Sequence, residues 1–107
     1  MIMLAISPSS YNKQFLIFHP PVKNIMMDHS QFIRIYYSTH NIIFNGIYLH
    51  LPTLEDSCRI EKDILESYKT DKKPIYSIKK LYKQKNLKIS GLWENDHCYG
   101  IVFKFIS

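Results

Sequence analysis

Apolar side chains recur at every second position in two stretches near the C-terminus, residues 87–93 and residues 99–105. A period of two is typical of β-strands, because successive side chains of a strand point to opposite faces. The polar residues Glu94-Asn-Asp-His97 between the two stretches are suited to a turn. The sequence therefore predicts a C-terminal β-hairpin. Its buried side is expected to carry Leu87, Ile89, Gly91 and Trp93.

Two further strands are predicted upstream, over residues 31–38 and 42–51. Both runs are rich in β-branched and aromatic residues, and Ser38-Thr-His-Asn41 supplies a turn that makes them antiparallel. Gly46 interrupts the second run and indicates a bulge or the close approach of another segment. Strict alternation along this run predicts one face with Ile43, Asn45, Ile47, Leu49 and Leu51, and a second face with Phe44, Gly46, Tyr48 and His50.

The clearest helical pattern covers residues 54–69, with Thr53 and Asp56 as a variant of the capping box at its start. Glu61 projects into the apolar side of this helix, either as an acid with a raised pKa or as a carboxylate that reaches water or a lysine. A second, short helix is predicted over residues 75–82, although its first residues also suit an extended chain. The apolar arc of the first helix consists of Leu54, Cys58, Ile60, Ile64, Leu65 and Tyr68.

These elements predict one α+β domain. A chain of 107 residues has the length of a single domain, and a hydrophobic content of 46% excludes a fully disordered chain. We expect a mostly antiparallel sheet of four or five strands over residues 26–107, with one main amphipathic helix packed on one face and a C-terminal β-hairpin. Residues 1–25, with one short strand candidate at 14–18, are expected to be a peripheral N-terminal extension, and Met26-Met27 suggests an alternative translation start.

The sequence favours a reducing compartment and no membrane segment. It contains only two cysteines, Cys58 and Cys98, and its N-terminus lacks the basic region and long apolar run of a secretory signal. Its longest apolar stretches fall short of the ~20 residues that a spanning helix needs. We therefore expect a cytoplasmic protein.

Charge is distributed unevenly along the chain, whose formal net charge is +5. Residues 53–68 hold five acids and two bases, whereas residues 69–88 hold eight lysines and one acid. Lysines interleaved with tyrosines can neutralise phosphates while an aromatic ring stacks on an unpaired base. The sequence therefore predicts weak, sequence-independent binding of single-stranded DNA or RNA. The candidate residues are Lys72, Lys73, Tyr76, Lys79, Lys80, Tyr82, Lys83 and Lys85.

Two other interpretations of this segment stay open. The lysines can be a solvated surface that keeps a small protein soluble, partly balanced by the acidic helix before them. Alternatively, the chain is a structural or protein–protein interaction subunit of a virion or scaffold, or a homo-oligomer, and has no nucleic-acid role. In that case an unpaired strand edge, for which residues 32–37 are a candidate, would bind the partner.

Catalysis, metals and cofactors are not predicted. The five histidines and two cysteines show no CxxC, HxxxH or HExxH spacing, and His97 and Cys98, although adjacent, would point to opposite faces of a strand. Neither cysteine lies in a local hydrolase signature. Three isolated glycines cannot form a phosphate-binding loop. We therefore expect an accessory protein that is not an enzyme.

Four segments resemble small uncharacterised proteins of large nucleocytoplasmic DNA viruses: Phe32-Ile-Arg-Ile-Tyr-Tyr-Ser38, Phe44-Asn-Gly-Ile-Tyr48, Leu87-Lys-Ile-Ser-Gly-Leu-Trp-Glu94 and Tyr99-Gly-Ile-Val-Phe-Lys-Phe105. The resemblance covers about residues 27–106 and depends mainly on the C-terminal hairpin. It implies a setting, either the cytoplasm of an infected host or the virion, and no activity that can be assigned to particular residues.

Overall fold

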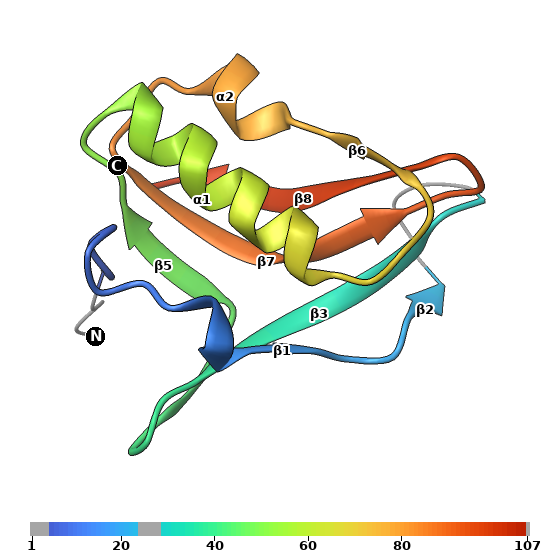
Figure 1. The fold of residues 1–107 in the computed structure, drawn as a ribbon, viewed down its shortest axis with the longest axis horizontal. Coiled ribbons are helices and arrows are strands. Elements are labelled where there is room, and N and C mark those ends of the chain that lie inside the picture. Colours follow the sequence, from blue (N-terminus) through green and yellow to red (C-terminus); the bar gives the residue numbers. More distant parts are fainter. Residues whose placement is uncertain (1–4, 24–28, 107) are drawn as a thin grey trace.

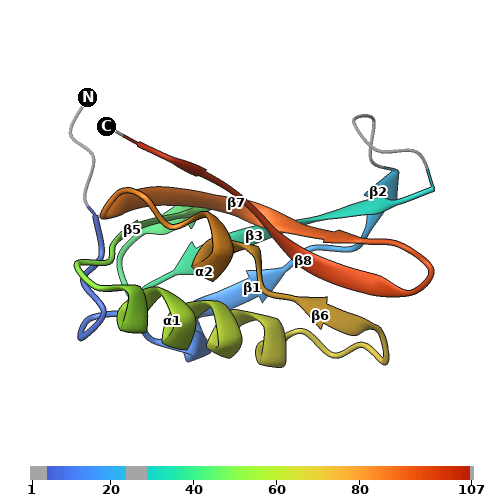
Figure 2. The ribbon, with the colours of Figure 1, turned by 90° about the horizontal axis from the view of Figure 1, so that it is seen from above.

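The computed structural model of the chain describes residues 5–23 and 29–106, which form an α+β fold (Figure 1). A single, mostly antiparallel sheet makes one layer, and α1 lies along one side of it (Figure 2). In chain order the elements are the 3-10 helix η1 (Lys13–Phe15), β1 (Leu16–Phe18), β2 (Val22–Lys23), β3 (Gln31–Ser38), β4 (Ile43–Asn45), β5 (Ile47–His50), α1 (Leu54–Ser67), β6 (Lys73–Ile75), α2 (Ser77–Leu81), β7 (Asn86–Glu94) and β8 (Cys98–Phe105).

The sheet is organised around β3, β7 and β8. β7 pairs antiparallel with β3 along one edge and with β8 along the other, which confirms the predicted C-terminal hairpin. β6 adds to the outer edge of β8 as the parallel strand of the described sheet. On its other side β3 pairs with β1 and β2, so the residues predicted as a free strand edge, 32–37, lie inside the sheet. That edge prediction is wrong.

The described chain contains eight strands, more than the four or five that we expected. Two of the additional strands, β2 and β6, are only two and three residues long. Strands of this length are too short to show an alternating pattern. The third arises because Gly46 divides the predicted strand 42–51 into β4, which pairs with β3, and β5, which pairs with β7.

The described part of the N-terminal segment, residues 5–23, lies against the sheet. β1 and β2 pair with β3, and Ile6 forms a bridge to Leu49 of β5. Its side chains Ile6, Tyr11, Phe15, Leu16 and Phe18 pack against the core. We expected a peripheral extension, whereas this part of the segment completes one edge of the sheet. The alternative start at Met26-Met27 lies outside the described residues.

Gly46 changes which side of the chain faces the core. Its φ of +89° is in the left-handed region, and a Cβ atom there would stand 2.7 Å from the carbonyl oxygen of Ile89. Beyond this bend the alternation is displaced by one residue. Ile43 is 68% exposed and Phe44 packs against the core, whereas Ile47 is buried, so Ile43 and Ile47 do not share the single face that strict alternation predicts.

A bulge in β7 has the same effect on Trp93. Ile89 pairs with Phe103 and Gly91 pairs with Val102, so Ser90 is an extra residue in the ladder. Leu92 is therefore fully buried on the core side, and Trp93 is partly exposed on the opposite face. The prediction that Trp93 faces the core is wrong because strict alternation cannot continue through a bulge.

The core lies between the sheet and the two helices. α1 ends two residues earlier than predicted, and the hydroxyl of Thr53 caps its start by accepting the N–H of Asp56 at 3.1 Å. Residues 75–82 divide into the end of β6 and the short helix α2, so both of the predicted conformations are present. The helices contribute Ile60, Ile64, Leu65 and Ile78 to the buried cluster.

Candidate nucleic-acid interface

The lysines predicted to bind nucleic acid lie on the surface around α2. Lys72 is half-buried, and its ammonium group donates to the carbonyl oxygen of Asp96 at 3.0 Å. The remaining members of the set, Lys73, Lys79, Lys80, Lys83 and Lys85, are exposed. These cations are therefore accessible to a ligand.

The two tyrosines of the predicted set have a different environment. Tyr76 and Tyr82 are half-buried and pack against the core. The Tyr82 hydroxyl donates to the carbonyl oxygen of Leu51 at 2.7 Å, and its ring meets the ring of Phe105 edge to face. The structure thus separates the lysines of this segment from its aromatic rings.

Glu61 is fully buried on α1 and neither reaches water nor pairs with a lysine ammonium. Its carboxylate accepts the backbone N–H groups of Ile78 and Lys79, at 2.9 and 3.3 Å, at the start of α2. Burial raises the pKa of this carboxyl, while the backbone hydrogen bonds act in the opposite direction. The arrangement makes Glu61 a cap that joins the two helices.

No group of three or more potential metal ligands occurs among the described residues. Cys58 and Cys98 are both free thiols of intermediate exposure, and His97, beside Cys98, is exposed. The His97 backbone N–H instead bonds to the side chain of Asn95 at 2.9 Å, as part of the turn between β7 and β8.

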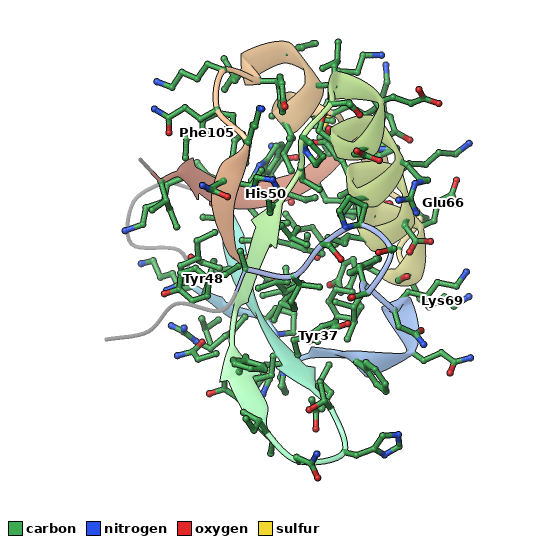
Figure 3. All side chains as sticks on the ribbon, turned by 90° about the vertical axis from the view of Figure 1, so that its left-hand side faces the viewer. Tyr37, Tyr48, His50, Glu66, Lys69 and Phe105 are labelled. Carbon is green, nitrogen blue, oxygen red and sulfur yellow. The ribbon has the colours of Figure 1, made fainter. Side chains whose placement is uncertain are left out.

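The face of the sheet opposite α1, called the open face below, carries aromatic side chains from three strands. β3 contributes Phe32 and Tyr36, β5 contributes Tyr48, and β7 contributes Trp93; all four are partly exposed. The register places Phe32 directly beside Trp93. Figure 3 shows Tyr48 projecting away from α1, on the side of the sheet opposite to Glu66.

The charged side chains that the register places on the open face are all cationic within the described part of the chain. They are Arg34, Lys88 and Lys104, with Lys73 of the edge strand β6 as a fourth, and Lys88 lies opposite Lys104 in the ladder. Arg34 lies 5.4 Å from the ring centroid of Phe32, and the ammonium of Lys88 lies 5.4 Å from that of Tyr48. Cation–π contacts of this kind hold a positive charge beside each ring.

The other side of the molecule has the opposite character. α1 carries Glu55, Asp56, Asp63 and Glu66 at exposed or half-exposed positions. Two bases on the same helix, Arg59 and Lys62, make long ion pairs with Asp56 and Glu66, at 3.8 and 4.0 Å. The molecule is therefore basic and aromatic on the open face and mainly acidic along the helix.

Sequence reasoning missed most of the open face. Phe32, Arg34 and Tyr36 alternate with the buried residues Ile33 and Ile35, and this pattern was a readable signal of a strand with one aromatic, basic face. Tyr48 was grouped on one face with Phe44, which packs against the core instead, and Trp93 was assigned to the core. Lys104 was not singled out because it lies outside the lysine-rich segment.

Comparison with known proteins adds no identification. No protein-family model matches the chain, and no curated protein or solved structure is significantly similar to it. Neither helix of the described residues has the length and apolar character required to span a membrane.

Proposed function

We propose that this chain is a small non-catalytic accessory protein that binds single-stranded nucleic acid, without sequence preference, on its open face. The observation that carries the proposal is the set of four partly exposed rings beside three cations, on a face where the register places no acid within the described residues. A cytoplasmic, viral setting is part of the proposal on the strength of the sequence resemblance alone.

Each component of the open face matches one part of a single strand. Unpaired bases stack on aromatic side chains, and such stacking contributes about 1–3 kcal/mol per base whatever the base is. Arg34, Lys88 and Lys104 neutralise phosphates, which makes the affinity dependent on salt. A duplex keeps the faces of its bases stacked on each other, so the rings favour single strands.

The exposed lysines around α2 have a supporting role in this proposal. Lys83 lies beside Phe105 of β8, with its ammonium 5.8 Å from the ring centroid, and so lies near the edge of the sheet that carries Lys104. Lys79, Lys80 and Lys85 extend the positive surface from this edge. A single strand of nucleic acid that extends from the open face past β8 would therefore contact further lysines but no further aromatic rings.

The proposal is tested with a fluorescein-labelled single-stranded oligonucleotide, by fluorescence anisotropy at several salt concentrations. In the triple variant Arg34→Gln, Lys88→Gln, Lys104→Gln, we expect weaker binding and a salt slope smaller by about two, because three phosphate contacts are lost. The variant Lys13→Gln, Arg59→Gln, Lys62→Gln removes the same charge from the helix side and is the matched control.

A third variant separates the open face from the lysine-rich segment. Lys79→Gln, Lys80→Gln, Lys83→Gln is expected to weaken binding less than the open-face triple, without lowering the melting temperature. A larger loss from this variant would place the site around α2. Absence of binding by the unmodified protein at low salt, or binding that salt does not change, would eliminate the proposal.

One observation favours a second function, that of a protein-interaction subunit. β6 covers the outer edge of β8 only at residues 98–100, and within the described chain no strand pairs with the same edge at residues 101–105. An unpaired strand edge can add a strand from a partner. Self-association or a stable protein complex, seen by light scattering without nucleic acid, would support this alternative.

A further inference from the structure

A groove runs along the uncovered edge of β8, between the open face and α2. Its volume is about 460 Å³, and its walls are largely apolar. Leu81, Trp93, Val102 and Phe103 form much of the lining, and Lys83 and Lys104 are its cationic residues. Leu81 is 60% exposed although its side chain is apolar, so this wall of the groove is in contact with water.

Trp93 forms a fixed aromatic wall of this groove. A Cβ atom on Gly100 would stand 2.8–2.9 Å from three atoms of the indole, so the ring lies directly on the backbone of Gly100. Trp93 and Gly100 are cross-strand neighbours on the open face. One side of the indole is therefore supported by the sheet, and the partly exposed remainder of the ring is presented to the groove.

The neighbouring strand edge supplies polar groups. Ile106 donates its N–H to Asn86 of β7, and Cys98 accepts the N–H of Asn95, so the even-numbered residues of β8 direct their peptide groups toward β7. In an antiparallel ladder the residues between these, here the odd-numbered ones, direct their peptide N–H and C=O groups away from the partner strand. The peptide groups of Phe103 and Phe105 thus face outward along the part of the edge that β6 does not cover.

The charges of the groove select between possible occupants. Both charged residues in its lining are lysines. A neutral apolar peptide would leave these two ammonium groups without a partner, whereas a nucleotide brings an apolar ring face together with a phosphate on either side. An aromatic base beside an indole also gains stacking energy that an aliphatic side chain does not.

We propose that the groove binds one unpaired nucleobase of a single strand, with its ring stacked on Trp93, its polar edge toward the outward peptide groups of β8, and its flanking phosphates near Lys83 and Lys104. This inference rests on the proposed function and deepens it, because it assigns one base of the strand to a defined position beside Trp93. Every base has a ring face and a polar edge, so the position does not require sequence preference.

Trp93 is the only tryptophan of the chain, and its fluorescence therefore reports on this groove directly. Two oligonucleotides of equal length and charge are compared on the intact protein, one of thymidines and one of abasic nucleotides. We expect both to bind by anisotropy with the same salt slope. Only the thymidine strand is expected to quench Trp93, and it is expected to bind about fivefold more tightly or better, which corresponds to one stacked base.

A variant that fills the groove provides a second measurement. Val102→Phe is expected to abolish the quenching of Trp93 by the thymidine strand and to reduce the preference for that strand, of which the part due to Phe32, Tyr36 and Tyr48 remains. Ile43→Phe, which enlarges an exposed residue on β4, is the matched control, and circular dichroism establishes that both variants are folded.

The outcomes separate the two proposals. Binding of both strands without quenching, or equal quenching by both, would overturn the base-binding groove and leave the proposed function standing. If neither oligonucleotide binds, both the base-binding groove and the proposed function are overturned. Retention of the thymidine-specific quenching of Trp93 in Val102→Phe would also rule out the groove as the position of the base.

Discussion

The buried carboxylate of Glu61 on α1 accepts the backbone N–H of Ile78 on α2 at 2.9 Å. The N–H of Lys79 bonds to the same carboxylate at 3.3 Å. The first N–H groups of a helix have no partner within it, so Glu61 satisfies groups that would otherwise be buried without one. The variant Glu61→Ala is therefore expected to lose about 2 kcal/mol of unfolding free energy, measured by urea denaturation with circular dichroism.

The control for this variant is Glu66→Ala on the same helix. Glu66 is exposed and pairs only with Lys62 at 4.0 Å, so its replacement is expected to change the unfolding free energy by less than about 0.5 kcal/mol. Equal losses in the two variants would show that the Glu61 bonds do not hold α2 in place.

The same carboxyl is expected to make stability depend on pH. In the unfolded chain Glu61 ionises near its ordinary pKa of 4.5, and burial raises its pKa in the folded protein. Between these values the folded state binds more protons than the unfolded state, so unfolding free energy falls as pH rises through the window. The stabilisation that comes from this raised pKa is fully present below pH 4.5 and is lost when the pH rises above the raised pKa.

The variant Glu61→Gln isolates this effect because it keeps an acceptor oxygen and removes the titration. The unfolding free energy of the unmodified protein, minus that of Glu61→Gln, is expected to fall as the pH rises above 4.5 and to level off above the raised pKa. Urea titrations at several pH values measure this difference. A difference that rises with pH would mean that the folded protein lowers the pKa of Glu61.

Gly46 is expected to tolerate no side chain. Its φ of +89° is strained for other residues, and the carbonyl oxygen of Ile89 lies where a Cβ atom would be. The variant Gly46→Ala is therefore expected to lose about 1–3 kcal/mol of unfolding free energy. Ile43→Ala, at an exposed position of β4, is the control with an expected change within about 0.5 kcal/mol, and equal values for both would contradict the strained bend.

The sequence signals that depend on a regular period predicted the fold well. The 3.6-residue pattern of α1, its Thr53 cap and the period-two patterns of β3, β7 and β8 all correspond to observed elements. What the pattern could not predict is where the period changes. Gly46 and Ser90 each displace the alternation by one residue, and as a result Ile43 does not share a face with Ile47, and Trp93 lies on the face opposite the core.

The candidate site was predictable only in its chemistry. Aromatic rings beside cations were expected, but within one continuous segment, residues 69–88. In the structure the rings of Tyr76 and Tyr82 pack against the core, whereas Phe32 and Trp93, distant in sequence, are brought together by the pairing of β3 with β7. Such a cluster depends on strand order and register, which a local pattern does not contain.

The bulge in β7 leads to a prediction about two adjacent residues. Leu92 is fully buried, so Leu92→Ala is expected to lose about 2–5 kcal/mol of unfolding free energy. Trp93 is larger but half-exposed on the open face, and its loss removes less surface from the folded core, so Trp93→Ala is expected to lose about 1–2 kcal/mol. Circular dichroism must follow unfolding, because Trp93→Ala removes the only tryptophan. Strict alternation through Ser90 would give the reverse order, with the larger loss of unfolding free energy in Trp93→Ala. That result would place the indole in the core, and Trp93 would then belong neither to the open face nor to the groove along β8.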